Sequence, residues 1–189
     1  MTDNKTRCGW ISDSLMQQYH DEEWGVPLHD DRKLFEFMVL DGFQAGLSWR
    51  TVLNKRENFR KAFLDFDPEK IAAFNEEKYE QLLLDPGIIR NRSKIRASIN
   101  NAKVFLKVQH EFGSFDKYIW SFVNNKPTKN SWKSLSEIPA KTEISDNMSK
   151  DLTKRGFKFV GSTICYAFMQ AAGMVNDHTV SCFRYKELI

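Results

Sequence analysis

Hydrophobic positions recur with helical spacing along most of the chain, and the strict alternation typical of strands is scarce. Leu34, Phe37 and Met38 stand at i, i+3 and i+4, which predicts one apolar helix face. Asp41 occupies the i+7 position of the same face. A carboxylate there costs free energy unless it is paired or used, so Asp41 is a candidate functional residue. A buried salt bridge or a helix cap is the alternative.

Capping residues and helix breakers divide the chain into successive helices. Gly156 and Gly173 are expected to end the last two. Helix starts are predicted at Asp30 or Asp31, Ser48, Asp67 before Pro68, Asn75, Asn91 or Ser93, Ser145, and Ser162 or Thr163. Residues 121–147 are polar and contain two prolines, which predicts a long surface connection. The pattern indicates an all-α fold in one domain spanning residues 1–189.

Composition narrows the class of protein. Of the 189 residues, 41% are hydrophobic and 28% are charged, as in an ordinary globular domain. The first residues lack the apolar run that directs export, and the longest uncharged stretch, 159–175, is short and broken by glycines. We therefore expect a cytoplasmic protein without a membrane contact. Three cysteines are an odd number, which argues against a disulfide framework.

Positive charge is concentrated in one segment, although the net charge is only +3. Residues 86–110 contain no acidic residue and six basic ones. Two predicted helices and the hairpin between them form a helix-hairpin-helix unit at about 76–108, and a hairpin followed by a helix N-terminus attracts phosphate. The groups expected to bind DNA without sequence preference are Gly87, Ile89, Arg90, Arg92 and Lys94. A solvated helix face is the alternative.

Cysteine and histidine residues lie near both ends of the chain. His178 and Cys182 are four apart, so they face the same way if that segment forms a helical turn. Cys8 and His20 supply a second pair, and two thiolates with two imidazoles make a closed, structural zinc site. The spacing from Cys8 to His20 fits no common zinc-finger pattern, so ordinary core or surface positions remain the alternative. Cys165 is expected to pack in an apolar helix.

Aromatic residues are dense in the N-terminal segment. Trp10, Tyr19 and Trp24 lie within a short stretch that also contains Asp21, Glu22 and Glu23. Aromatic side chains of this kind usually belong to a core. Flat rings can also stack on an extruded nucleic-acid base, and they hold a positively charged base especially well.

Taken together, the motifs resemble those of one family, the bacterial 3-methyladenine DNA glycosylases of type I, within the helix-hairpin-helix superfamily. The resemblance runs in order through nearly the whole chain. It is carried by Arg7-Cys-Gly-Trp10, Tyr19-His-Asp-Glu-Glu-Trp-Gly-Val-Pro27, Gln44-Ala-Gly-Leu-Ser-Trp49, Lys55-Arg-Glu-Asn58, Gly87-Ile-Ile-Arg90, Arg155-Gly-Phe-Lys-Phe-Val-Gly161 and Asn176-Asp-His178.

The resemblance implies a metal site and a base pocket. A structural Zn²⁺ would join segments 7–27 and 174–185 through Cys8, His20, His178 and Cys182. Asp41 would be the catalytic and base-recognising carboxylate, hydrogen-bonded to the adenine edge. The base would be stacked by Trp10, Tyr19 and Trp49.

The implied reaction is hydrolysis of the N-glycosidic bond of N3-methyladenine in double-stranded alkylated DNA, which leaves an abasic site and the free base. Methylation makes the base a cation and a good leaving group, so little acid or base assistance is needed. No Asp or Glu occurs from Lys154 to Asn176, and no lysine stands in an obvious nucleophile context. The resemblance therefore implies a monofunctional enzyme, which we expect to be a monomer in the bacterial cytoplasm, at the nucleoid.

Two positions depart from the family pattern. Asp41 stands where the family usually has glutamate, which withdraws the carboxylate by ~1.5 Å. Met16 stands where a second pocket tyrosine is common. These departures leave a second hypothesis open, a zinc-stabilised DNA-binding protein without catalysis, and an assay for released base separates the two.

Overall fold

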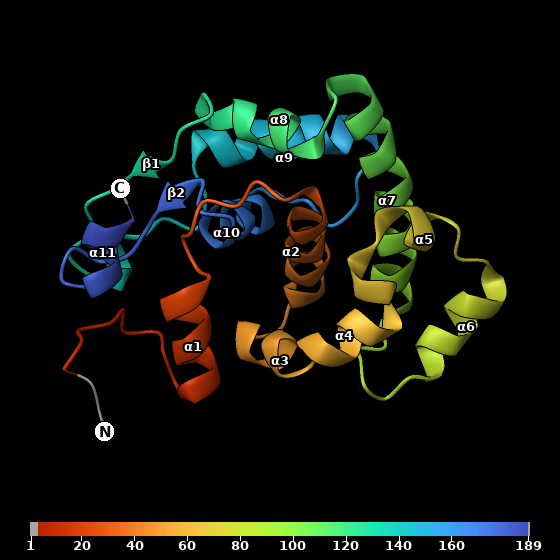
Figure 1. Ribbon diagram of the computed structural model, residues 1–189, viewed down its shortest axis with the longest axis horizontal. Helices are drawn as coiled ribbons and strands as arrows, with labels where there is room; N and C mark the ends of the chain where they lie inside the picture. Colours follow the sequence, from red (N-terminus) through yellow and green to blue (C-terminus); the bar gives the residue numbers. More distant parts are fainter. Residues whose placement is uncertain (1–3, 189) are drawn as a thin grey trace.

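The computed structural model describes residues 4–188, and most of them form helices (Figure 1). A parallel pair of two-residue strands completes the secondary structure of this part of the chain. In chain order the elements are α1 (Ser14–Glu22), α2 (Asp31–Gln44), α3 (Trp49–Asn54), α4 (Arg56–Ala62), η1 (Leu64–Phe66), α5 (Pro68–Ala72), α6 (Glu76–Leu84), α7 (Arg92–Phe112), α8 (Phe115–Trp120), η2 (Ser121–Val123), β1 (Thr128–Lys129), η3 (Leu135–Glu137), α9 (Glu143–Arg155), α10 (Ser162–Ala171), β2 (Val175–Asn176) and α11 (Phe183–Glu187).

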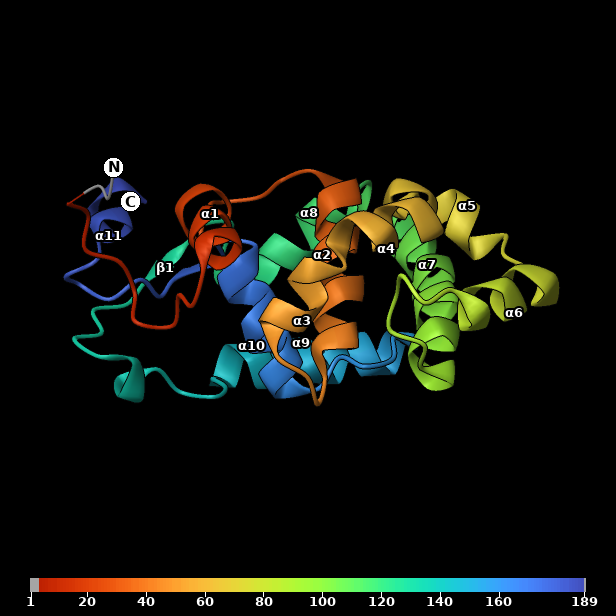
Figure 2. The ribbon, with the colours of Figure 1, turned by 90° about the horizontal axis from the view of Figure 1, so that it is seen from below.

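Helix α2 runs through the middle of the molecule, and most other helices are arranged around it (Figures 1 and 2). It packs against α3, α7, α8 and α10, and its residues 34–43 are all buried. Aromatic side chains fill the space around it, as in the contacts of Phe35 with Phe105 and of Phe43 with Phe59, whose ring centroids are 4.9 and 4.7 Å apart. A carboxylate on α2 is therefore placed close to the centre of the fold.

Most predicted helix starts are confirmed. The side chains of Asp30, Ser48, Asp67, Asn75 and Asn91 each accept a backbone N–H from the first turn of α2, α3, α5, α6 and α7. These bonds satisfy donors that have no partner inside the helix, which is why such residues begin helices.

The start of α9 differs from the prediction at Ser145. The helix begins one turn earlier, after Thr142, whose hydroxyl accepts the N–H of Ser145. The hydroxyl of Ser145 in turn accepts the N–H of Thr142, at 2.8 Å. Ser145 is thus the inner half of a reciprocal capping box, and the long polar connection is correspondingly shorter than 121–147.

The N-terminal segment that precedes α1 lies next to α11 (Figures 1 and 2). The Phe183 N–H donates to the Thr6 carbonyl at 2.9 Å, and Thr128 of β1 pairs with Val175 of β2. Gly173, with a φ of 67°, lies so close to the α1–α2 link that a Cβ there would be 2.3 Å from the Val26 carbonyl carbon. Only glycine allows this approach. Among residues 4–188, no helix has the length and apolar character needed to cross a bilayer.

Candidate active site and metal cluster

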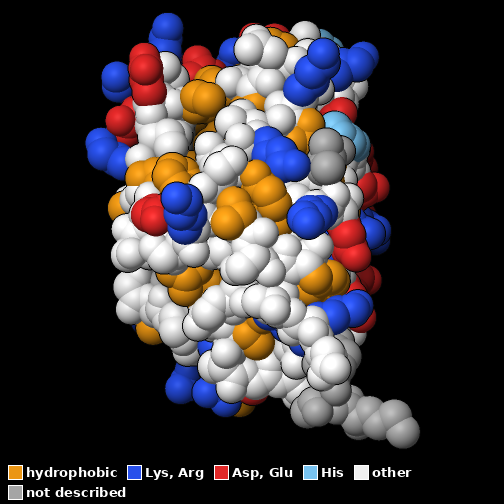
Figure 3. Space-filling model, turned by 90° about the vertical axis from the view of Figure 1, so that its left-hand side faces the viewer, with side chains coloured by type: hydrophobic (Ala, Val, Ile, Leu, Met, Phe, Trp, Pro, Cys, Tyr) orange, Lys and Arg blue, Asp and Glu red, His pale blue; other side chains and the backbone are white. Residues whose placement is uncertain are grey.

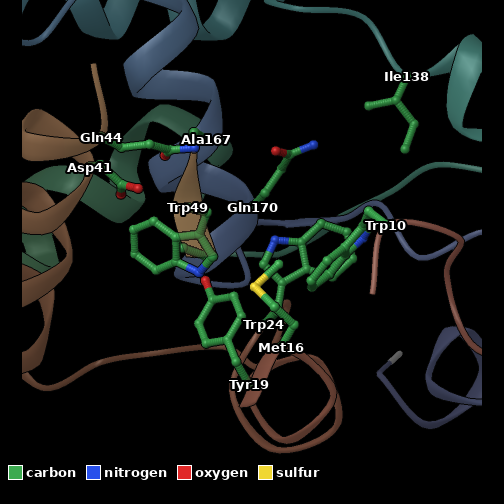
Figure 4. Close-up of a pocket in the computed structure, with 11 residues that line it drawn as sticks. Trp10, Met16, Tyr19, Trp24, Asp41, Gln44, Trp49, Ile138, Ala167 and Gln170 are labelled. Atoms are coloured by element: carbon green, nitrogen blue, oxygen red, sulfur yellow. The ribbon is translucent and has the colours of Figure 1, made fainter. Parts of the chain in front are cut away.

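A cavity of about 290 Å³ opens between α1, α2, α3 and α10 (Figure 4). Its volume is at the lower end of the range for small-ligand pockets, which suits one flat molecule. None of its lining residues is Lys, Arg or His, so the lining presents no side-chain cation. They are Trp10, Met16, Tyr19, Trp24, Asp41, Gln44, Trp49, Ile138, Ala167, Gln170 and Ala171.

Four aromatic rings form a continuous group along the cavity. The ring centroids of Trp10 and Trp24 are 5.1 Å apart, and those of Tyr19 and Trp49 are 5.3 Å apart. Trp10 and Tyr19 link the two pairs at 6.4 Å. The structure thus brings together the three predicted ring residues, adds Trp24, and confirms that Met16 lines the cavity. These four rings form the aromatic cage. Met16 lies where a second tyrosine would have added a further ring to it.

Asp41 is buried at the cavity wall, with 3% of its surface exposed. Its Oδ2 atom has no hydrogen-bond partner among residues 4–188, and the same holds for the buried Nε1 of Trp49. Burial raises the pKa of Asp41 well above its usual value. Burial, together with the charge of Asp41, also raises the pKa of Tyr19. A buried acid without a partner is costly, so its place at a cavity indicates a binding role.

Gln44 and Gln170 are polar lining residues that the sequence reasoning did not select. Gln170 lies on α10 between Ala167 and Ala171, both of which line the same cavity. A polar residue flanked by small ones on an apolar helix is the signal that could have revealed it. Asp41 stands out for a related reason, as a carboxylate on the apolar face of a helix.

The four predicted metal ligands converge in a buried cluster. The candidate ligand atoms of Cys8, His20, His178 and Cys182 all lie within 4.8 Å of one another. Cys182 Sγ is 3.4 Å from His20 Nε2 and 3.5 Å from His178 Nδ1, and these two nitrogens are 3.2 Å apart. The hydrogen bond from Cys8 lowers the pKa of Cys182, and both histidines add to the effect. The cluster can therefore hold a metal ion.

The segment around the second pair differs from the prediction, because residues 177–182 form turns rather than a helix. His178 and Cys182 still face each other, with Cys182 Sγ 3.5 Å from His178 Nδ1. Helix α11 begins only at Phe183, and the Cys182 N–H closes the preceding turn by donating to the Thr179 carbonyl. The chain reversal places both side chains on the same side without helical periodicity.

The remaining ring nitrogens of the two histidines are held by other groups. The His178 Nε2–H donates to the Trp24 carbonyl at 3.0 Å, and His20 Nδ1 is 2.7 Å from the carboxylate of Asp21. The His178 ring also lies 4.6 Å from the Trp24 ring, and the His20 ring lies 5.3 Å from that of Trp10. The cluster and the aromatic cage therefore share a wall. From outside, this end of the molecule mixes Lys and Arg with Asp and Glu (Figure 3).

The predicted DNA-binding segment forms the connection between α6 and α7. Arg90 and Arg92 are exposed and Ile89 is half-buried. The Gly87 N–H, however, donates to Asp85 Oδ1 at 2.7 Å, so it is already used within the turn. A Cβ on Gly87 would be 2.9 Å from that same oxygen, which explains the glycine.

Lys94 points inward, in contrast to its predicted contact with phosphate. Only 7% of its surface is exposed, and its ammonium donates to the carbonyls of Phe43 and Ala45 at 2.8 and 2.5 Å. These carbonyls lie at the C-terminal end of α2, where a cation is favourable. Lys94 thus ties the start of α7 to the turn between α2 and α3.

That turn lies beside the cavity and carries an exposed apolar side chain. Leu47 is 43% exposed, between Gln44 and Trp49, which both line the cavity. Gly46 precedes it with a φ of 78°. Figure 2 shows this turn, the start of α7 and the start of α10 along one edge of the molecule. The N-cap of α10 is Gly161, which has no side chain, so the first N–H groups of this helix have no side-chain acceptor there.

The family model for methyladenine glycosylases matches residues 10–185, and the chain belongs to this family. DNA-3-methyladenine glycosylase 1 of Escherichia coli is 57% identical over 180 residues, which cover 95% of this chain and 96% of that protein. DNA-3-methyladenine glycosylase of Haemophilus influenzae is 49% identical over 178 residues, covering 94% and 96%.

Solved structures of similar proteins have the same fold. A crystal structure of 3-methyladenine DNA glycosylase I matches with a TM-score of 0.92 and 55% identity, covering 94% of this chain and 98% of the other. A tyrosine-to-phenylalanine variant of such an enzyme, in complex with 3-methyladenine, matches with a TM-score of 0.91 and 36% identity, covering 94% and 96%. The Staphylococcus aureus enzyme, described with the structural basis of its 3-methyladenine recognition, also matches at 0.91 and 36%, covering 96% and 97%.

Proposed function

We propose that this protein is a monofunctional DNA glycosylase that excises N3-methyladenine from alkylated DNA by hydrolysis of the N-glycosidic bond. One observation carries the proposal: a dry, unpartnered acid, Asp41, adjoins a cage of aromatic rings whose lining contains no side-chain cation. Such a cavity favours a flat, positively charged guest. Membership of the methyladenine glycosylase family supports the same reading.

The positive charge of the methylated base supplies most of the chemical driving force. Extrusion from the duplex would place the base between the rings of Tyr19, Trp49 and the two other tryptophans, where stacking and cation–π attraction hold it. Asp41 would accept a hydrogen bond from the exocyclic amino group, and a cation beside it favours the ionised carboxylate that burial disfavours. No lysine lines the cavity, so no amine is placed to form an imine with the sugar.

We further propose that the Cys/His cluster binds a structural Zn²⁺. Bond lengths of 2.3 Å to sulfur and 2.0–2.1 Å to nitrogen in a tetrahedron give ligand separations of about 3.5 Å for S···N and about 3.3 Å for N···N. The separations of 3.4–3.5 Å and 3.2 Å between the corresponding atoms fit this geometry. Four protein ligands complete the coordination, so the ion would fix segments 7–27 and 174–185 and hold Trp10 and Trp24 in place.

The edge that carries the α2–α3 turn and the starts of α7 and α10 is the surface we propose for double-stranded DNA (Figure 2). Arg90 and Arg92 would bind phosphates, and the α6–α7 unit would act as a helix-hairpin-helix. Leu47 would fill the space that the extruded base leaves, because it is apolar, exposed and next to the cavity. Gly87 and Lys94 would support this surface from within.

The proposed substrate places the work of the protein at the bacterial nucleoid in the cytoplasm. One copy suffices, because one chain supplies every lining residue of the cavity and every residue of the metal cluster. We therefore propose a monomer that acts as a single domain over residues 1–189.

Chromatography of bases released from methylated DNA tests the function directly. We expect the protein to release 3-methyladenine, and we expect Asp41→Asn to slow release at least about tenfold, because it loses the charge that faces the cation. Asp41→Glu, with the glutamate usual in the family, should remain active. Asp31→Asn, a change at a carboxylate outside the cavity, is the matched control. A wild-type protein that binds DNA but releases no base would support the non-catalytic alternative.

A further inference from the structure

The side-chain amide of Gln170 is held in one orientation by a buried carboxylate. Gln170 Nε2 donates to Asp177 Oδ2 at 2.8 Å, and Asp177 is 1% exposed. The same carboxylate accepts at 2.6–2.8 Å from Asn130 Nδ2, Trp132 Nε1 and Tyr166 OH. A carboxylate surrounded by four donors accepts from all of them, so the nitrogen end of the Gln170 amide faces Asp177. The oxygen end must then face the other way.

The amide oxygen of Gln170 points into the base cavity. Figure 4 shows the Gln170 amide with its oxygen end on the side of Asp41 and Gln44, which also line the cavity, and its nitrogen end on the opposite side. Within residues 4–188, no donor forms a hydrogen bond with this oxygen. The cavity therefore has a fixed acceptor on the wall opposite Asp41.

The two walls would face opposite edges of an adenine bound between them. The exocyclic amino group and N7 form one edge, and N3 and C2–H lie on the other. If Asp41 binds the amino edge, the oxygen of Gln170 faces N3. In unalkylated adenine, N3 carries a lone pair, and two acceptors that face each other in a dry site repel. An alkyl group on N3 removes the lone pair and presents electron-poor C–H groups to the oxygen.

We infer that Gln170 is a specificity-determining residue that admits purines alkylated at N3 and rejects purines whose N3 is free, including those alkylated at N7. The inference rests on the proposed function, because it takes Asp41 to bind the amino edge. Asp177 acts through Gln170 as a positioning residue. Selectivity of this kind comes from an unfavourable contact with the wrong base as well as from favourable contacts with the right one.

Gln170→Met tests the inference, because methionine has a similar length and no strong acceptor. The full, zinc-loaded protein is titrated with free 3-methyladenine and with adenine, using the fluorescence of the pocket tryptophans. We expect the ratio of the dissociation constant for adenine to that for 3-methyladenine to fall by about tenfold or more in Gln170→Met. Gln18→Met, at an exposed position on α1, is the matched control and should keep the wild-type ratio.

Asp177→Asn is the second variant, since it frees the Gln170 amide to turn. With zinc content and Tm measured alongside, it should lower the same ratio. In methylated DNA, both variants should release more 7-methylguanine relative to 3-methyladenine than the wild type does. A wild-type ratio of dissociation constants in folded Gln170→Met would overturn the inference. Failure of the wild-type protein to release 3-methyladenine would instead overturn the proposed function.

Discussion

Asp41 provides a test in which a loss of function is expected to stabilise the fold. The carboxyl group is 3% exposed and its Oδ2 atom has no partner among residues 4–188. A buried polar atom without a partner costs about 1–3 kcal/mol, and an ionised one costs more. Asp41→Asn keeps the shape and removes the ionisable group. The amide of asparagine also lies without a partner, so the gain comes from the ionisation alone. We therefore expect the variant to be more stable than the wild type near pH 8, by about 1.4 kcal/mol for each pH unit by which burial raises the pKa of Asp41.

The difference should depend on pH in a defined direction. Burial raises the pKa of Asp41 in the folded chain, so the folded state keeps a proton that the unfolded state gives up. The stability associated with this proton is complete below the unfolded pKa of about 3.9 and is lost as pH rises toward the folded pKa, by up to about 1.4 kcal/mol per pH unit. Wild type and Asp41→Asn should therefore converge near pH 4 and separate above it.

Thermal unfolding of both proteins from pH 5 to pH 8 measures this difference. For a chain of this size each kcal/mol corresponds to about 2–4 °C in Tm. Asp31→Asn is the matched control, and it should lower Tm instead of raising it. The Asp31 carboxylate accepts hydrogen bonds from the N–H groups of Phe115 and Asp116 and from Gln109 Nε2. A lower Tm for Asp41→Asn at pH 8, or a difference that does not grow with pH, would refute the reasoning.

Three further predictions follow from the cluster, the turn and Lys94. Removing metal with a strong chelator should lower Tm and abolish binding of free 3-methyladenine, and adding Zn²⁺ should restore both. If the metal-free protein still binds the base, the metal does not hold the aromatic rings in place. Leu47→Ala should slow single-turnover release of base from duplex DNA about tenfold, while the affinity for the free base stays unchanged. Equal release rates in the variant and the wild type would show that Leu47 does not fill the space left by the extruded base. Lys94→Met should lower Tm by more than Lys103→Met, a change at an exposed position on α7. It should also slow base release more than it weakens DNA binding. Lys94→Arg should restore part of the release rate.

The sequence was most informative where local chemistry decides structure. Asp30, Ser48 and Asn91 cap helices in the structure as predicted, because a cap needs only a side-chain oxygen and a free N–H a few residues away. The carboxylate of Asp41 is buried as the helical spacing indicated. Its environment could be predicted because helical periodicity alone places i+7 on the same face as i and i+4.

Tertiary contacts were harder to predict than caps. Lys94 lies in a basic stretch that suggests an exposed face, yet its ammonium is bound by carbonyls from α2, about fifty residues away in the chain. His178 and Cys182 meet through a turn, although their spacing suggested a helix. The orientation of Gln170 depends on Asp177, which directly follows a strand, β2, that pairs with a distant segment. Such contacts leave no local periodic signal.

The pairing of the chain ends has a consequence for biosynthesis. Trp10 and Tyr19 leave the ribosome more than 150 residues before His178 and Cys182 do. Because the rings of Trp10 and Trp24 rest against His20 and His178, the cage cannot assemble during most of translation. A nascent chain that stops before His178 would carry Asp41 and most of the helices without the second half of the Cys/His cluster. The proposed base pocket would therefore be completed only after His178 has been made.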